Sequence, residues 1–244
     1  MPLSVHPIQS SAKVADFDLF DSLKTDLENS SLRPENGDVI VISSKYVARS
    51  QGRYLKYQDV YPSQEAEIVS KKFSIKQTVA EIILRESDVI FGGIPGFVIT
   101  SADYIMAPNA GIDKSNAESG TIILYPKDPY HIAEQLRRKF LLTYDVHVGI
   151  IISDSRLMPA RSGTVGVAIA CAGIEPTSDL RGKKDLHGNP LKVTFQAVAD
   201  DLASIANLKM GEGSEAIPSV IIKDAGVRLT DRKIREDEMA ISHE

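Results

Sequence analysis

Two runs of aliphatic and β-branched residues constrain the fold more than any other feature of the chain. The clearest is 146–154, VHVGIIISD, and a second is 37–45, GDVIVISSK. Both are apolar through their middle and do not alternate with polar residues. Such runs are typical of strands that are buried on both faces of a sheet. Serine or aspartate ends each run, so polar side chains are expected where these strands leave the core.

The remaining pattern is a mixture of helices and short strands. Helices are predicted at 63–73, 75–87, 129–144 and 194–213, strands within 88–108, 120–126 and 218–224, and a hairpin over 184–195 with its turn at Gly188-Asn189. The run 163–173, GTVGVAIACAG, fits a strand or a helix equally well. Strands and helices do not alternate regularly enough for a doubly wound sheet.

We therefore predict an α+β fold with mixed sheets and packed helices, and without a Rossmann or phosphate-loop core. The chain, 1–244, is expected to form a single unit, with room for a smaller subdomain in the middle third whose boundary stays open. Residues 225–244 form a polar tail.

Composition excludes several classes of partner. The net charge of −5 gives no general attraction for nucleic acid or an anionic membrane. No apolar run approaches the roughly 20 residues that a membrane span needs, and the N-terminus does not resemble a secretory signal. A single cysteine, Cys171, excludes an intrachain disulfide. We expect a cytoplasmic protein that binds neither nucleic acid nor membrane.

Common catalytic motifs are missing from the sequence. It has no G-x-x-x-x-G-K-[ST] loop, G-x-G-x-x-G turn, H-E-x-x-H helix or G-x-S-x-G elbow. The five histidines have no spacing typical of zinc ligands. Cys171 lies in an apolar run, which indicates a thiol buried in the core. No side chain stands out as a covalent nucleophile.

Oxygen-bearing side chains at the ends of elements are the remaining candidates. Asp113 lies in the polar stretch 107–120, where a plain Asx-turn also explains it. Asp154 and Ser155 follow an apolar strand, and Glu212 lies at the end of a helix. A carboxylate there opposes the helix dipole at a cost of about 0.3–1 kcal/mol, which a bound cation would reverse. Carboxylate and hydroxyl oxygens suit Mg²⁺ or Mn²⁺, but sequence spacing does not show that these residues meet.

Basic residues recur every four positions directly after the first buried strand. Lys45, Arg49 and Arg53 follow the hydroxyls of Ser43 and Ser44. On a helix they would form one solvated basic face. At the end of a strand they could instead hold phosphate groups, and composition leaves both readings open.

Several motifs, taken in order, resemble the coenzyme F-420 γ-glutamyl ligase family. They are GDVIVISSK, NAGIDKSN, IISDS, GKKDLHGNPLKVT and VADDLASIANLKMGEG, and the likeness runs from about residue 7 to about residue 222. The resemblance implies an enzyme that uses GTP to join L-glutamate to a deazaflavin coenzyme precursor. It also implies an acyl phosphate intermediate, a two-part subunit, an intertwined homodimer and two Mg²⁺ or Mn²⁺ ions, and it allows K⁺ as a further ion.

Residue roles carried over from the family fall on two groups. The metal ligands would be Asp113, Asp154, Ser155 and Glu212. The nucleotide contacts would be Pro7, Ile8, Ser44, Lys45, Arg49, Asn116, Met210, Gly211, Gly213, Ser214, Glu215 and Ile217. Lys45 and Arg49 would neutralise phosphate charge.

The chain departs from the family pattern at 154–163, DSRLMPARSG. Leu157 and Met158 replace a Gly-Arg pair, and Ala160 replaces an aromatic residue. This segment resembles a side branch described as γ-glutamate ligases, so Arg156 and Arg161 become candidate acceptor contacts. Two alternatives follow: the same ligase chemistry on another carboxylate, such as a folate-like compound, or a relative that binds nucleotide or coenzyme without catalysis.

Overall fold

The computed structural model describes residues 2–11, 16–102, 105–113, 117–158 and 161–239. Within them the largest sheet has five strands, in the order β1-β12-β2-β8-β9. These strands are β1 (Ser4–Ile8), β2 (Val39–Ser43), β8 (Gly149–Leu157), β9 (Thr164–Ala172) and β12 (Ser219–Lys223). Only the β2–β8 pair of this sheet is parallel. The prediction of an α+β fold with mixed sheets is confirmed, and this sheet lacks the all-parallel pattern of a Rossmann core.

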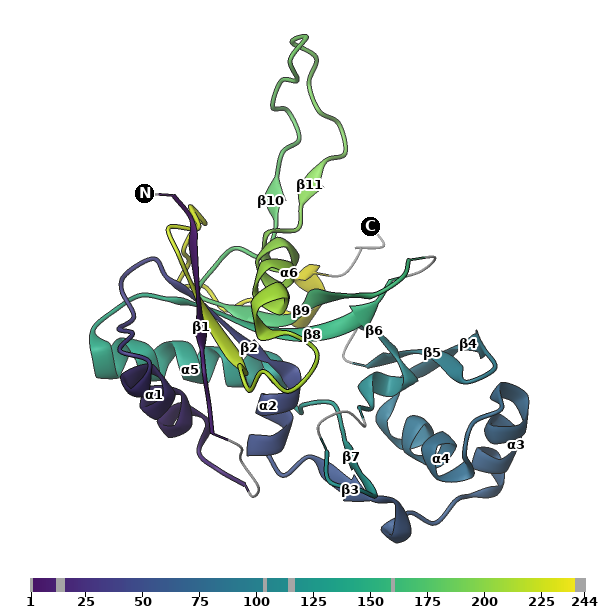
Figure 1. Cartoon of the computed structure of the whole chain (residues 1–244). Coiled ribbons are helices and arrows are strands. Elements are labelled where there is room, and N and C mark those ends of the chain that lie inside the picture. Colours follow the sequence, from purple (N-terminus) through teal and green to yellow (C-terminus); the bar gives the residue numbers. More distant parts are fainter. Residues whose placement is uncertain (1, 12–15, 103–104, 114–116, 159–160, 240–244) are drawn as a thin grey trace.

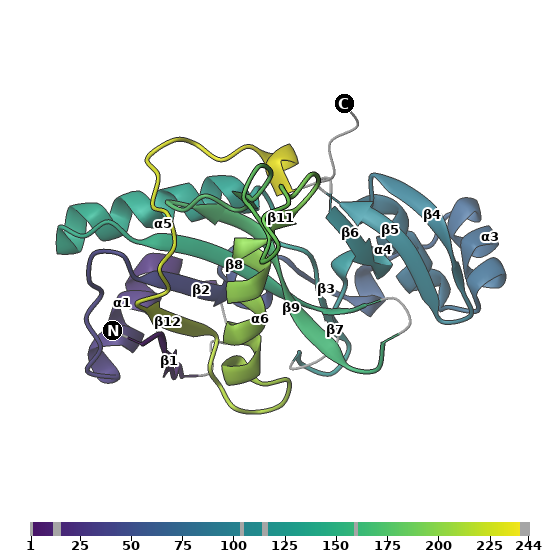
Figure 2. The same ribbon diagram turned by 90° about the horizontal axis from the view of Figure 1, so that it is seen from above.

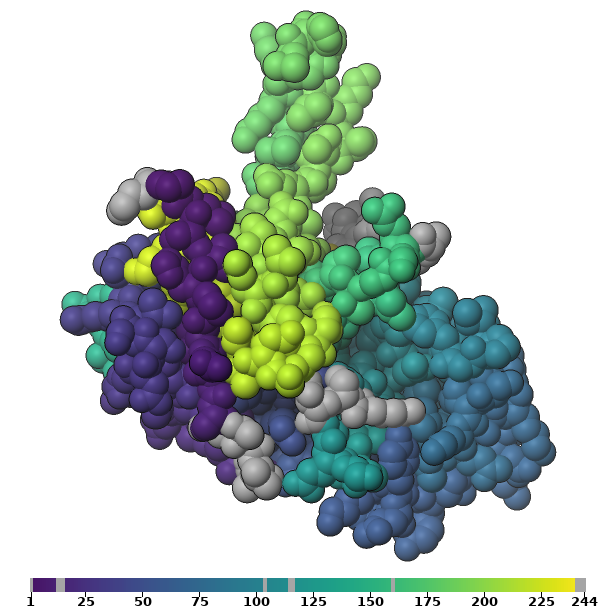
Figure 3. Space-filling model, viewed as in Figure 1, coloured from purple at the N-terminus to yellow at the C-terminus, as the bar shows by residue number. Residues whose placement is uncertain are grey.

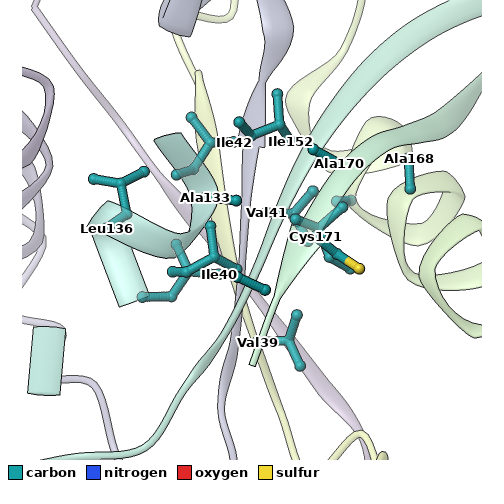
Figure 4. Packing of buried hydrophobic residues seen from close by; sticks show 14 of the residues in the cluster. Val39, Ile40, Val41, Ile42, Ala133, Leu136, Ile152, Ala168, Ala170 and Cys171 are labelled. Atoms are coloured by element: carbon teal, nitrogen blue, oxygen red, sulfur yellow. The ribbon is translucent and has the colours of Figure 1, made fainter. Parts of the chain in front are cut away.

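Both predicted buried strands lie in the middle of this sheet. Val39, Ile40, Val41 and Ile42 of β2 are fully buried. Figure 4 shows Ile40 and Ile42 on the side of helix α5, while Val41 lies on the opposite side. Burial on two faces explains why the runs are continuously apolar. Each fully buried aliphatic side chain contributes about 1.5–3 kcal/mol to folding.

Helices cover the two faces of the sheet. Helices α1 (Leu19–Asn29) and α5 (Pro129–Tyr144) pack on each other through Phe20 and Phe140, whose ring centroids are 5.1 Å apart. Helix α6 (Val198–Met210) crosses the other face, as Figures 1 and 2 show. The short helix α2 (Ser44–Ser50) starts directly after β2. In the described part of the chain, no helix has both the length and the apolarity to cross a membrane.

The middle third forms a second, smaller part with its own apolar clusters. Its elements are β3 (Tyr54–Lys56), α3 (Gln64–Phe73), α4 (Gln77–Glu86), β4 (Val89–Ile94), β5 (Phe97–Ala102), β6 (Ile105–Pro108) and β7 (Thr121–Ile123), with 3-10 turns η1 (Tyr57–Asp59) and η2 (Asn109–Gly111). Helices α3 and α4 pack on the β4-β5-β6 sheet through Phe73, Ile83 and Val98. This part lies to the right of the main sheet in Figures 1 and 2.

Two segments extend this core. Strands β10 (Ser178–Asp179) and β11 (Phe195–Gln196) are the base of a long hairpin, which stands clear of the body in Figure 3. After β12 the polar C-terminal segment packs back onto the main part and ends in the 3-10 turn η3 (Glu236–Met239). Its Ile234 is buried in the main core, and Arg232 pairs with Glu175.

Element boundaries differ from the sequence predictions in specific ways. The undecided run 163–173 is strand β9, because it pairs along β8. Strand β8 continues to Leu157, so Asp154 and Ser155 lie within the strand and not after it. Helix α6 begins only at Val198, because Phe195 and Gln196 pair with β10. Strand β1 and helix α1 have no counterpart in the sequence predictions.

Candidate functional site

A cavity of about 700 Å³ lies between the two parts of the chain. Its walls come from the start of α2, the loop around Asn109–Asp113, the outer half of β8 and the loop after α6. The parallel pairing of β2 with β8 ends at Ser43 and Ser153, so Ser44 and Asp154 lie just beyond it, near the edge where open sheets commonly bind ligands. Residues that are far apart in the sequence thus lie together in the walls of this cavity.

The predicted site residues divide clearly by position. Those that line the cavity are Ser44, Lys45, Arg49, Asp113, Asp154, Ser155, Arg156, Met210, Gly211, Glu212, Gly213, Ser214, Glu215 and Ile217. Arg161 is exposed and does not line it, nor do Pro7 and Ile8 in β1, where Ile8 is fully buried in the core. Ser10 and Ser11, just beyond them, do line it. Asn116 lies outside the described residues.

Asp154 is held from two sides. The Ser44 hydroxyl donates to Oδ1 at 2.7 Å, and Nε of Arg156 donates to Oδ2 at 2.9 Å. The register of β8 against β9 shifts between Ile152 and Ser153. Such bulges often occur beside active sites, where they redirect the side chains that follow. Asp154 therefore has a defined orientation beside the cavity.

Glu212 accepts hydrogen bonds from three side chains. Ser155 donates at 2.5 Å, Thr164 at 2.8 Å and Asn207 at 3.1 Å, all to Oε1. Partial burial acts to raise the pKa of Glu212. The hydrogen bonds from Ser155, Thr164 and Asn207, with the charge of Lys45, outweigh burial and lower the pKa below its ordinary value. These donors offset the unfavourable position of a carboxylate after a helix, so Glu212 is ionised without a bound cation.

The loop after α6 needs glycine at its first position. Gly211 ends the helix with φ +73, and a Cβ atom there would come within 2.4 Å of the Glu215 carboxylate. That carboxylate accepts from the backbone N–H of Gly213 at 2.8 Å. The MGEG sequence thus folds into a tight turn that presents Glu212 to the cavity.

Asp113 follows a strained loop. Asn109, Ala110 and Gly111 all have positive φ, which is costly for the two residues that carry side chains. The loop is held by Asn109 Oδ1, which accepts from Val98 N–H at 2.9 Å, and by Thr100 Oγ1, which accepts from Ala110 N–H at 2.9 Å. Asp113 Oδ2 then contacts Lys45 Nζ at 2.7 Å. The strain is localised where a charged pair meets the cavity.

The carboxylates suit a hard divalent cation by their chemistry. Asp113, Asp154, Ser155 and Glu212 line one cavity, and all four would bind a cation through side-chain oxygen. Within the described residues, however, no three His, Cys, Asp or Glu side chains cluster closely enough to hold one ion. The three carboxylates lie against separate partners, so the donor set fits ions bound at neighbouring positions better than one three-carboxylate cage.

The charges around the cavity also bear on its ligand. In the described part of the chain the basic residues lining it are Lys45, Arg49 and Arg156, and the acidic ones are Asp113, Asp154, Glu212 and Glu215. Each of Asp113 and Asp154 already has a basic partner. The lining thus carries one more acidic than basic residue, and divalent cations bound here would offset the charge of a polyanionic ligand.

Sequence reasoning missed several residues of the site. Thr164 and Asn207 orient Glu212, while Phe97 and Ile112 supply apolar wall. Asn207 lies one helical turn before Gly211, so the helix predicted at 194–213 could have pointed to it. Arg53, which would share one basic face with Lys45 and Arg49 if all three were helical, lies beyond the end of α2 and pairs with Glu86. No sequence signal indicates Phe97.

Several known proteins that are similar to this chain share one description. The chain is 40% identical over 203 residues to a protein of Methanocaldococcus jannaschii described as "Coenzyme F420:L-glutamate ligase", with 83% of this chain and 81% of that protein covered. Proteins with the same description from Archaeoglobus fulgidus (36% over 202 residues; 83% and 81% covered) and Methanopyrus kandleri (39% over 190 residues; 78% and 75%) are also similar. A sequence model described as "F420-0:Gamma-glutamyl ligase" matches residues 11–224. The chain therefore belongs to the F420-0:γ-glutamyl ligase family.

Proposed function

We propose that this protein is a GTP-dependent ligase that joins L-glutamate to the carboxylate of coenzyme F420-0, with further γ-linked glutamates as additional products. The observation that carries the proposal is the meeting of Ser44, Lys45, Asp113, Asp154 and Glu212 in one cavity of about 700 Å³. That volume is within the range of small-molecule sites, about 300–1,000 Å³. Relatives that share most of the chain are described as ligases of this coenzyme and L-glutamate.

The reaction needs activation because a carboxylate is a poor electrophile. An acceptor carboxylate oxygen attacks the γ-phosphorus of GTP, and GDP leaves. The glutamate amine then attacks the carbonyl carbon of the acyl phosphate, phosphate leaves, and the nitrogen loses a proton as the amide forms. In this reaction the protein positions the reactants and offsets their charge, and it forms no covalent bond with them. Cys171 accordingly needs no role: it is buried and does not line the cavity.

Each part of the cavity has a distinct role in this proposal. Lys45 and Arg49 line the cavity and would offset the charge of the bound phosphates. The turn from Met210 to Ile217 follows the nucleotide, and Asn116 is retained as a nucleotide contact. Asp113, Asp154, Ser155 and Glu212 would hold two Mg²⁺ or Mn²⁺ ions, with K⁺ as an allowed further ion. When bound, the divalent ions supply Lewis-acid stabilisation of the phosphate oxygens.

The other acceptor class remains a second candidate because of one observation. Leu157 stands in the cavity wall where the family carries a glycine, next to Met158 in place of arginine. One cation fewer at this point favours an acceptor that carries less negative charge there, which leaves another carboxylate, such as a folate-like compound, as the second candidate. A relative that binds without catalysis is disfavoured, since a site that only binds need not keep Asp113, Asp154 and Glu212 together.

A homodimer is part of the proposal. The hairpin between β10 and β11 projects from the body, with Leu186 fully exposed, Val193 largely exposed and Phe195 half exposed. Isolated two-stranded hairpins have marginal stability in water. Packing of this hairpin on a second copy would bury its apolar side chains. Light scattering at micromolar concentration should give twice the mass of one chain, and a monomer would remove the dimer from the proposal.

Product analysis tests the proposed reaction. Purified protein is incubated with GTP, Mn²⁺, L-glutamate and either F420-0 or a folate-like acceptor, and the products are read by mass spectrometry. We expect glutamylated F420-0 together with GDP and phosphate. The variant Glu212→Gln should make little product, while Glu65→Gln, an exposed change on α3, serves as the matched control. Glutamylation of the second acceptor alone would replace the acceptor assignment.

A further inference from the structure

The guanidinium group of Arg156 is buried where the two parts of the chain meet. Its side chain is only 6% exposed. Nε donates to Asp154 Oδ2 at 2.9 Å, Nη1 donates to the carbonyl of Met106 in β6, and Nη2 donates to the Tyr125 hydroxyl at 3.0 Å. Every nitrogen of the side chain is therefore engaged by a protein group.

These partners belong to different parts of the structure. Asp154 is in β8 of the main sheet, Met106 is in β6 of the smaller part, and Tyr125 follows β7. The guanidinium carbon lies 5.8 Å from the centroid of the Tyr125 ring. Arginine is suited to such a junction because its planar fork directs several donors along fixed lines. One side chain thus ties a wall of the cavity to the carboxylate beside it.

Tyr125 extends this connection to the loop before Asp113. A Cβ atom at Gly111 would lie 2.4 Å from Cδ2 of the Tyr125 ring, so the ring packs directly on that backbone. The same ring holds Arg156 through its hydroxyl. Arg156 is therefore linked to two of the cavity carboxylates, to Asp154 directly and to Asp113 through Tyr125 and the loop.

We infer that Arg156 is a positioning residue, which orients the Asp154 carboxylate and fixes the β6 wall, and is not an acceptor contact. This inference rests on the proposed function, in which Asp154 binds a metal ion that accompanies the nucleotide. Ser44 and Arg156 each donate a hydrogen bond to the Asp154 carboxylate, and removing Arg156 would leave that of Ser44. The acceptor role considered for Arg156 from sequence would require it to leave its buried partners, which is costly for a paired charge.

A positioning role and an acceptor contact predict different measurements. Loss of a group that orients a metal-binding side chain typically weakens metal binding 10-fold to 100-fold. Loss of an acceptor contact raises KM for the acceptor and leaves metal-dependent nucleotide binding unchanged. Binding of a fluorescent, non-hydrolysable GTP analogue at increasing Mg²⁺ separates the two without relying on turnover.

The variants are Arg156→Gln, Arg156→Lys and Tyr125→Phe in the full chain. For Arg156→Gln we expect the Mg²⁺ midpoint of nucleotide binding to rise about 10-fold or more, with the acceptor KM within about threefold of the wild type. Arg156→Lys keeps the charge and should show a smaller rise. Tyr125→Phe keeps the contact with Asp154 and should shift the midpoint least. Arg156→Gln removes a buried charge and should lower Tm, so the other two variants carry the test if it does not fold.

Arg138→Gln is the matched control, since Arg138 lies on the exposed face of α5 and pairs with Glu134, away from the cavity. Its Mg²⁺ midpoint should equal that of the wild type. An Arg156→Lys midpoint within threefold of the wild type, or a tenfold rise in acceptor KM alone, overturns the positioning role. If the wild type binds the nucleotide equally well without Mg²⁺, the metal-dependent function fails, and the inference fails with it.

Discussion

The Ser44 hydroxyl donates to Asp154 Oδ1 at 2.7 Å, although 110 residues separate the two in the sequence. The contact exists because β2 and β8 are parallel neighbours, with Ser43 opposite Ser153. One residue further along, Lys45 contacts Asp113 from the other part of the chain. The end of β2 is therefore the point from which both candidate metal-binding aspartates are held.

Replacing Ser44 by alanine should weaken metal-dependent nucleotide binding. The change removes one of two donors to Asp154, so we expect the Mg²⁺ midpoint for nucleotide binding to rise about 3-fold to 10-fold, which corresponds to about 0.7–1.4 kcal/mol. Ser50→Ala is the control, because Ser50 lies in the same helix and donates to the Val47 carbonyl instead. Equal midpoints for the two variants would show that the Ser44 contact has no role in binding.

Replacing Gly111 by alanine should be far more harmful than the same change at Gly37. Both glycines have positive φ, +69 and +91, so both changes carry a backbone penalty of about 1 kcal/mol. At Gly111 the new Cβ atom would also collide with the Tyr125 ring. At Gly37 no atom lies within 4 Å of the position that a Cβ atom would take. We expect a larger loss of unfolding free energy for Gly111→Ala in denaturant titrations. Equal losses would mean that the Tyr125 contact is readily relieved.

Cys171 should be unreactive in the folded protein. Burial raises the pKa of its thiol to about 12, and the thiolate is the reactive form. A thiol reagent at pH 8 should therefore label the protein only after denaturant is added, at one site per chain. Rapid labelling of the native protein would show that the β9 region opens readily or that the thiol is accessible.

The pairing of Glu175 with Arg232 should stabilise the C-terminal segment in a pH-dependent way. Hydrogen bonding from Arg232 holds the pKa of Glu175 below its ordinary value of 4.5, against the effect of burial. A lowered folded-state pKa gives stability that is present above pH 4.5 and is lost as pH falls through the folded-state value.

A double-mutant cycle with Glu175→Gln and Arg232→Gln measures this contribution. The pair is partly exposed, so we expect a coupling free energy of about 0.5–1 kcal/mol at pH 7. It should shrink as the pH is lowered below 4.5. Coupling that stays constant down to pH 3 would contradict the assignment.

Much of the fold could be predicted because local pattern and final environment agree. The runs around Ile40 and Ile151 are buried on both faces, and their continuous apolarity records that burial. The sequence of β9 did not decide between a strand and a helix, because its small residues are compatible with both. Pairing with β8 makes it a strand. Helix α1 was missed although Asp18 caps it and accepts from Asp21 N–H at 2.9 Å. Its apolar face consists of a few separated residues such as Phe20 and Leu23, a weak periodic signal.

The sequence suggested most of the residues that line the cavity but not how they are held. The positions of Asp113, Asp154 and Glu212 at the ends of predicted elements suggested oxygen donors, and the family resemblance suggested that they act together. Neither indicates that Arg156, a surface-like residue by type, would be 6% exposed and hold Asp154. That arrangement depends on Met106 and Tyr125, which meet β8 only when the smaller part packs against the sheet.

The most direct test of the account follows oxygen from the acceptor to phosphate. The acceptor carboxylate is labelled with ¹⁸O, and the protein is supplied with GTP, L-glutamate and Mn²⁺. Activation through an acyl phosphate breaks the carbon–oxygen bond in the second step, so one labelled oxygen should appear in inorganic phosphate for each amide formed. Glutamylated product accompanied by unlabelled phosphate would contradict the proposed mechanism, and GTP hydrolysis without glutamylated product would contradict the proposed function.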